Sequence, residues 1–168
     1  MTQLFAQPYD ISASGFYFSS FDEFQSRAAL TRNDFGFPVE EYEIQFIDGD
    51  SLDAHLFEAL GVNQANIGAF LEACENWNIE QKQKAIIAVG ECGYTFDLKS
   101  GDPDDFDVDL YEMNNLRELA EHFVEEGLFG EIPKHLQNYL DHDAIARDLG
   151  MDYAEITLVG KRLIYRSF

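Results

Sequence analysis

Closely spaced aspartates at residues 105–109 are the first feature of the sequence with a possible chemical role. Asp105, Asp107 and Asp109 alternate with apolar residues, which is typical of a strand with one buried face. The three carboxylates would then project from the other face about 6.6 Å apart, because each step spans two residues of the strand. A row of this kind can hold a metal cation or face a basic partner.

A calcium loop is the first of these possibilities. After Asp-x-Asp-x-Asp, an EF-hand requires glycine at the sixth position and a bidentate glutamate at the twelfth. Leu110 and Leu116 occupy these positions, so the match fails. An irregular cation site at other acidic turns stays an alternative, although turn residues need no ion; its candidates are Asp48, Asp50, Asp102 and Asp104.

A second set of acids follows on a predicted helix. Glu118, Glu121 and Glu125 share one outer face, although like charges at this spacing cost about 0.2–0.5 kcal/mol per pair. No lysine is interleaved, so the pattern indicates either a solubility role or a basic partner. The acids that we predict to face such a partner are Asp105, Asp107, Asp109, Glu112, Glu118, Glu121, Glu125, Glu126, Glu41 and Glu43.

The net charge of the whole chain narrows the choice of partner. Its 168 residues include 32 acidic and 11 basic side chains, a formal charge of −21. This charge argues against nucleic acid and anionic membranes as partners, because both are bound through clustered Lys and Arg. Residues 1–60 carry −9, residues 91–131 carry −11, and residues 132–168 are neutral. We therefore expect subunit contacts in the neutral segment.

The same charge suggests imitation of a DNA backbone. Double-stranded DNA carries one charge per about 1.7 Å, so the 21 net charges match about 36 Å of duplex. Rows of carboxylates could occupy the cationic DNA groove of an enzyme. Two alternatives stay open at this point: an acidic module that binds another basic protein, and adaptation to high salt.

Catalytic and cofactor motifs are scarce. The sequence lacks Walker A, G-x-G-x-x-G, G-x-S-x-G and H-E-x-x-H patterns, and its four histidines are scattered. Cys74 and Cys92 have no neighbouring ligand pattern, which indicates reduced thiols. We predict no enzyme activity, no cofactor and no metal, with a metal-dependent hydrolase as the last alternative. Without a signal-peptide pattern or a long apolar stretch, a cytoplasmic protein is expected.

Periodicity and capping motifs predict an α+β protein of three small modules. These are an acidic α+β module, a helical module and a C-terminal α+β module, at residues 1–50, 51–103 and 104–168. In the first, a Ser20 capping box opens a helix to about Leu30; strands are expected at 15–18 and 41–46. Three helices are expected in the second: one at 52–60 with a Ser51 cap, one from an Asn63 cap to Trp77, and one from an Asn78 cap to about Val89.

The third module is expected to begin with the strand at 105–110. Asn115 then caps a helix with an apolar stripe at Leu116, Leu119, Ala120, Phe123 and Val124. Pro133 suits the first turn of a helix over 134–140, and another helix is expected from Asp141 or Asp143 to Gly150. A β-hairpin that turns at Gly160-Lys161 is expected to end the chain.

The segment 119–149 resembles the C-terminal domain of the ArdA antirestriction proteins. Four motifs carry the resemblance: Glu-Glu-Gly at 125–127, Gly-x-Ile-Pro at 130–133, Leu-Gln-Asn-Tyr-Leu-Asp at 136–141, and Ala-x-x-Arg-Asp-Leu at 144–149. The similarity is weaker over 41–100. The first twenty residues depart from the family pattern, so we expect the first module to be shortened or differently paired.

The resemblance implies an elongated protein of three modules that forms a homodimer through the C-terminal one. Such a protein mimics B-form DNA and occupies the DNA-binding groove of type I restriction-modification enzymes, which inhibits restriction and in some members modification. It implies neither a cofactor nor catalysis. On this basis residues 132–168 are expected to supply the dimer contacts.

Overall fold

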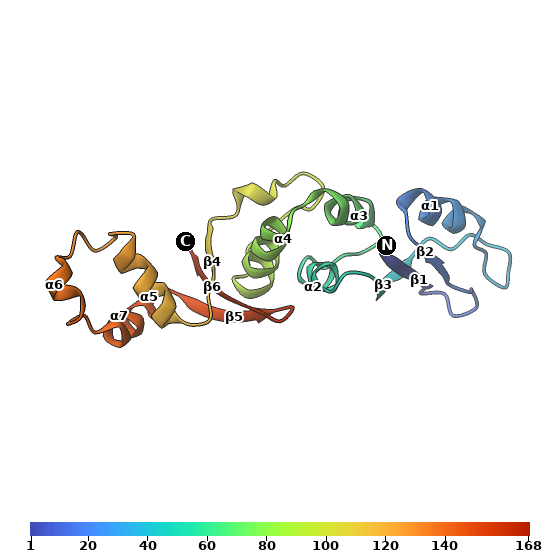
Figure 1. Ribbon diagram of the computed structural model, residues 1–168. Coiled ribbons are helices and arrows are strands. Elements are labelled where there is room, and N and C mark those ends of the chain that lie inside the picture. Colours follow the sequence, from blue (N-terminus) through green and yellow to red (C-terminus); the bar gives the residue numbers. More distant parts are fainter. The chain divides into compact units, whose positions relative to one another are not determined.

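The computed structural model describes all 168 residues and divides into two compact units, residues 1–106 and 107–168. Each unit combines helices with one antiparallel sheet of three strands (Figure 1), which confirms the predicted α+β class. The first unit contains both the first and the second of the expected modules. A division at residue 50 stays a prediction.

The sheet of the first unit has β1 at its centre. β1 (Gln3–Pro8) pairs antiparallel with β2 (Phe16–Phe18) on one side and β3 (Tyr42–Asp48) on the other. Leu4 and Ala6 are fully buried, because alternate residues of a strand face the same side. The first residues of the chain therefore form a complete central strand.

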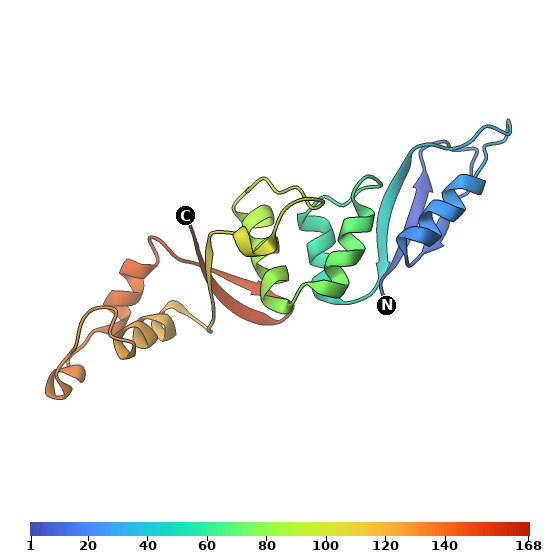
Figure 2. The ribbon, with the colours of Figure 1, turned by 90° about the horizontal axis from the view of Figure 1, so that it is seen from above.

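Helix α1 (Phe21–Leu30) lies against this sheet (Figure 2). Ser20 caps the helix as predicted, accepting a hydrogen bond from a backbone N–H of the first turn. Phe24 carries the contact with the strands, since its ring centre lies 5.1 Å from that of Phe18 and 5.8 Å from that of Tyr42. Aromatic packing thus fixes the helix on the sheet.

The rest of the first unit is helical. Its elements are α2 (Ser51–Ala59), α3 (Ile67–Asn76), α4 (Ile79–Ala85), the π-helix η1 (Ile86–Glu91) and the 3₁₀ turn η2 (Pro103–Asp105). Phe57 joins them to the sheet, because its ring centre lies 5.8 Å from that of Phe46 on β3 and 5.4 Å from that of Phe70 on α3. One apolar core therefore runs from the sheet into the helices.

Two boundaries in this region differ from the predicted ones. Asp50 rather than Ser51 caps α2, since the carboxylate of Asp50 accepts the hydrogen bonds from the first turn. The helix expected from residue 63 begins at Ile67, because the Asn63 side chain accepts the N–H of Ala65 and holds a turn instead.

The second unit packs helices on a sheet in the order β4-β6-β5. Its strands are β4 (Val108–Glu112), β5 (Ala154–Leu158) and β6 (Lys161–Ser167), and its helices are α5 (Leu116–Glu125), α6 (Lys134–Gln137) and α7 (His142–Leu149). The core consists of Leu119, Phe123, Tyr153 and Ile164. None of the helices in either unit is long and apolar enough to cross a membrane.

Three expectations for the C-terminal part of the chain are corrected. The strand predicted from residue 105 begins at Val108, because Pro103 and the capping carboxylate of Asp102 form a 3₁₀ turn first. The helix expected over 134–140 is a single turn that ends at Gln137. The hairpin turns at Val159-Gly160, one residue earlier than predicted.

Candidate partner-binding surface

Strand β6 places basic side chains beside the acids of β4. Asp109 and Arg166 are opposite each other in the register, and Arg166 Nη2 donates to Asp109 Oδ2 at 3.1 Å. Glu112 and Lys161 form a second, longer ion pair at 3.5 Å. The expectation of an unmixed acidic face is therefore wrong for this sheet, because the last strand of the chain supplies the cations.

The row of three aspartates is also shorter than predicted. Asp105 ends the turn η2 in the first unit, and Asp107 precedes β4, so only Asp109 lies on the strand. The backbone carbonyl of Asp107 accepts a hydrogen bond from the N–H of Phe168 at 3.3 Å. A regular strand spacing of about 6.6 Å thus does not apply to Asp105.

Helix α5 carries the second predicted row, and its N-terminus is built as expected. The Asn115 side chain accepts the N–H of Glu118 at 2.9 Å. The Glu118 carboxylate in turn accepts hydrogen bonds from the backbone and side chain of Asn114, at 3.0 and 3.1 Å. These two bonds, the backbone one first, hold the pKa of Glu118 below its ordinary value. Glu118 therefore stabilises the helix start as well as adding charge.

One arginine neutralises part of the helix face. Arg117 donates to Glu121 at 3.2 Å and to Asp143 of α7 at 2.9 Å. The hydrogen bond to Glu121 and the nearby charge of Asp143 raise the pKa of Arg117. All three side chains are about half exposed, so the cluster contributes little stability. Glu125 and Glu126, at the end of the helix, enter none of the ion pairs.

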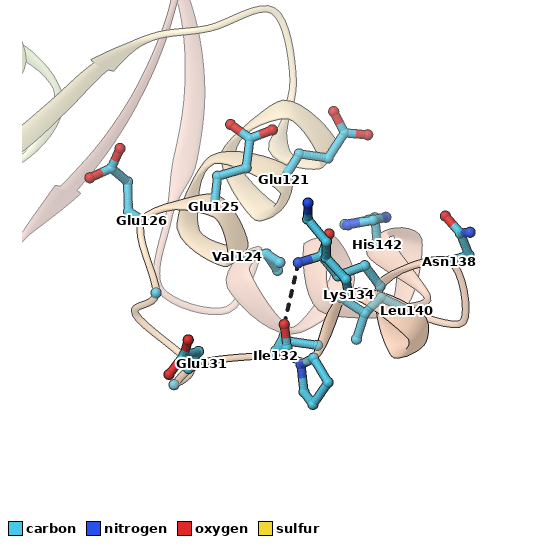
Figure 3. Close-up of a pocket in the computed structure, with 14 residues that line it drawn as sticks. Glu121, Val124, Glu125, Glu126, Glu131, Ile132, Lys134, Asn138, Leu140 and His142 are labelled. Atoms are coloured by element: carbon cyan, nitrogen blue, oxygen red, sulfur yellow. Dashed lines mark hydrogen bonds between the residues drawn. The ribbon is translucent and has the colours of Figure 1, made fainter.

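A hollow of about 790 Å³ lies between α5, the following loop and α6 (Figure 3). Glutamates from the helix and from the loop border it, namely Glu121, Glu125, Glu126 and Glu131. Lys134 and His142 also line the hollow. Gln137 Nε2 donates to the carbonyl of Ile132 at 3.3 Å, which braces the loop. An excess of carboxylates makes this hollow suited to a cationic group.

Large apolar side chains are exposed next to this hollow. Leu128, Phe129, Leu136 and Tyr139 lie in the segment between α5 and α7, and each is at least 45% exposed. Exposed large apolar side chains that gather on one surface are typical of a protein-protein contact. We name these four residues the C-terminal apolar patch.

Glu41 and Glu43 lie in the first unit. Glu43 is on the solvent side of β3, between the buried Tyr42 and Ile44, as the alternation predicts. Its carboxylate accepts a hydrogen bond from Gln45 Nε2 at 3.3 Å. The backbone carbonyl of Glu41 accepts the N–H of Tyr9 at 3.1 Å, which ties the start of β3 to the end of β1.

The structure thus disperses the predicted strand row and keeps the helix row on α5. Asp109 and Glu112 on β4 are ion-paired with Arg166 and Lys161, Asp107 precedes β4, and Asp105, Glu41 and Glu43 belong to the first unit. Glu118 lies at the start of α5, and Glu121, Glu125 and Glu126 border the hollow. Sequence reasoning did not place Glu131 or Asp143 on this surface. Their position in the sequence did not predict this location, because Glu131 lies in the loop after α5 and Asp143 lies on the separate helix α7. No group of three or more His, Cys, Asp or Glu is placed to hold a metal ion.

The geometry defines an acidic α+β protein with a large excess of surface carboxylates. The family model described as antirestriction protein (ArdA) matches residues 21–160. This match covers most of the chain, so the chain belongs to the ArdA antirestriction protein family. The match begins at residue 21, which agrees with the departure of the first twenty residues from the family pattern. A search of curated protein sequences gave no match.

Proposed function

We propose that this antirestriction protein mimics B-form DNA and occupies the DNA-binding groove of a type I restriction-modification enzyme, inhibiting restriction and, through the same groove, modification. The observation that carries the proposal is the excess of carboxylates without a basic partner. Most of the 32 acidic residues are exposed to solvent, and the chain has only 11 basic side chains to neutralise them.

Both units contribute to this charge. Residues 1–106 contain 19 acidic and five basic side chains, a net charge of −14, and residues 107–168 contain 13 and six, a net charge of −7. A groove that binds DNA phosphates is lined with Lys and Arg, and it attracts any surface with a similar density of negative charge. The acids proposed to face it are those predicted from the sequence, namely Asp105, Asp107, Asp109, Glu112, Glu118, Glu121, Glu125, Glu126, Glu41 and Glu43. Asp109 and Glu112, which are ion-paired with Arg166 and Lys161, are expected to contribute least to the attraction.

We further propose a homodimer formed by the second unit. The C-terminal apolar patch supports this contact, because it exposes Phe129 by 53% and Tyr139 by 84%. Residues 132–168, which include Leu136 and Tyr139 of this patch, carry no net charge, so two copies repel each other less there than at the acidic segments. Sedimentation of the wild type and of a Leu136→Asp/Tyr139→Ser variant tests the contact. A dimer that persists unchanged in the variant contradicts it.

Competition with DNA tests the proposed function directly. A labelled duplex is bound to the methyltransferase core of a type I enzyme, and the protein is added over a series of salt concentrations. We expect displacement of the duplex at low salt and a steep loss of affinity as salt rises, because both ligands use the same cations. No displacement at the lowest salt overturns the proposal. Capture of a basic partner that does not bind DNA favours an acidic interaction module instead.

A further inference from the structure

Two loops of the first unit are fastened together at the end of its sheet. Asn33 Nδ2, in the loop between α1 and β3, donates to Asp10 Oδ2, in the loop between β1 and β2, at 3.0 Å. The N–H of Asp34 donates to Ser12 Oγ at 3.1 Å, and Ser12 Oγ donates to Asp10 Oδ1 at 2.8 Å. These bonds join segments more than twenty residues apart in sequence, so neither loop is free to move alone.

The second loop is also held internally. Asn33 Oδ1 accepts the N–H groups of Phe35 and Phe37, each at 3.0 Å, and the backbone of Asn33 bonds to that of Phe37. Gly36 has φ of 79°, a conformation that favours glycine and lets the chain reverse between the two phenylalanines. The loop is therefore built as a tight, ordered turn.

This ordered framework presents apolar side chains to solvent. Ile11 is 99% exposed, Phe35 is 82% exposed and Phe37 is 66% exposed. We name these three residues the apolar tip. Single exposed apolar residues are common on protein surfaces, but three on two loops that are cross-linked by hydrogen bonds form a preorganised group.

The loops that carry the apolar tip are acidic. They contain Asp10, Asp34, Glu40 and Glu41. The one basic residue among them, Arg32, donates to the backbone carbonyls of Ala29 and Thr31 rather than to a carboxylate. The hydrogen bonds from Asn33 and Ser12 also hold the pKa of Asp10 below its ordinary value, so this carboxylate stays charged.

We propose that the apolar tip is a second docking point on the basic enzyme that the protein inhibits, and that it inserts into an apolar socket bordered by Lys or Arg. The inference rests on the proposed function and adds an interaction that DNA itself does not make. Charge complementarity selects this occupant: apolar side chains on acidic loops fit an apolar centre with a basic rim, and an apolar centre with a polar rim is the usual arrangement of an interface anchor. A second copy of this chain is disfavoured at this point, because it would bring the acidic loops of two copies together.

The test compares variants in the same duplex-displacement assay. Ile11→Ser, Phe35→Ser and Phe37→Ser are combined in the full-length protein, which leaves its net charge unchanged. We expect the concentration needed for displacement to rise about tenfold or more, as for the loss of interface anchors, with the salt dependence unaltered. Asn33→Ala removes the side-chain hydrogen bonds that hold the two loops together. It is also expected to raise the concentration needed for displacement, because the apolar tip is then no longer preorganised.

Matched controls separate the tip from other causes. Ile79→Ser, at a position of the first unit that is 61% exposed, and Met151→Ser, 85% exposed in the second unit, are expected to displace DNA like the wild type. Displacement by the tip variant within twofold of the wild type overturns the inference while the proposed function stands. Absence of displacement by the wild type overturns the proposed function itself. A change in sedimentation caused by the tip variant identifies a second copy as the occupant and also overturns the inference.

Discussion

Lys82 Nζ lies 2.6 Å from Asp53 Oδ1 inside the first unit, where the two side chains are only 11% and 8% exposed. The two side chains form a close ion pair, and Lys82 also donates a hydrogen bond to the carbonyl of Cys74 at 2.8 Å. One ammonium group thereby joins α2, α3 and α4. Removal of either charge would leave the other buried without compensation.

Lys82→Met is expected to lower the free energy of unfolding of the first unit by about 3–5 kcal/mol, because Asp53 is then buried unpaired. The double variant Asp53→Asn/Lys82→Met is expected to cost less than the single one. Urea denaturation followed by the fluorescence of Trp77, the one tryptophan of the chain, reports on this unit. Lys84→Met is the matched control, because its partner Glu80 is 67% exposed. A loss below about 1 kcal/mol for Lys82→Met contradicts a stabilising pair.

The thiol of Cys74 is expected to resist alkylation. Burial, and secondarily the charge of Asp53, raise its pKa to about 12. A raised pKa keeps the thiol protonated, so at pH 8 the reactive thiolate is about a thousandfold rarer than for a thiol of pKa 9.0. Iodoacetamide treatment and peptide mapping should leave Cys74 unmodified in the native protein and modify it in urea. Equal rates in both conditions would falsify this prediction.

Val159 occupies an unfavourable backbone conformation at the turn between β5 and β6. Its φ is 51° and that of Gly160 is 74°, which together form a two-residue turn that favours Asn-Gly. Val159→Asn is expected to stabilise the second unit by about 0.5–1 kcal/mol, because asparagine tolerates the left-handed conformation better than a β-branched residue. Gly160→Ala is expected to destabilise it. Hydrogen exchange of the β5 and β6 amides measures both effects, and faster exchange in Val159→Asn contradicts the first.

Helix starts could be predicted from the sequence because their causes are local. Ser20, Asn78, Asn115 and Asp141 each cap a helix through a side chain that reaches an N–H three residues on. The alternation at Tyr42 and Ile44 predicted the buried face of β3 for the same reason. The errors in the helix start after Asn63 and in the hairpin turn at Val159 were shifts of the boundary by one to four residues.

The candidate surface was less predictable, because it depends on contacts between distant segments. The acids of β4 and α5 were identified, but the cations beside the acids of β4 are Arg166 and Lys161 on the last strand. Their pairing depends on the register of β4 with β6, because a shift of one residue would move each side chain of a strand to the opposite face of the sheet. The fastening of Asn33 to Asp10 likewise joins two loops that no short motif connects.

Paired and unpaired acids are expected to differ in their contribution to binding. Glu125→Gln/Glu126→Gln removes two carboxylates that enter no ion pair. Glu112→Gln/Lys161→Gln removes one ion pair from the same unit and leaves the net charge unchanged. The first variant should displace DNA less effectively and with a shallower salt dependence, because two fewer carboxylates pair with the cations of the groove and salt screens such pairs.

The second variant should retain both the affinity and the slope of the wild type, because a carboxylate already matched by a lysine adds little to the external field. Displacement assays at several salt concentrations, with the stability of each variant checked by denaturation, measure the difference. Equal losses in the two variants would show that Glu112 binds the partner in spite of Lys161. Unchanged slopes in both would show that the end of α5 lies outside the interface, and would move the search for the binding acids to the first unit, which carries the larger net charge.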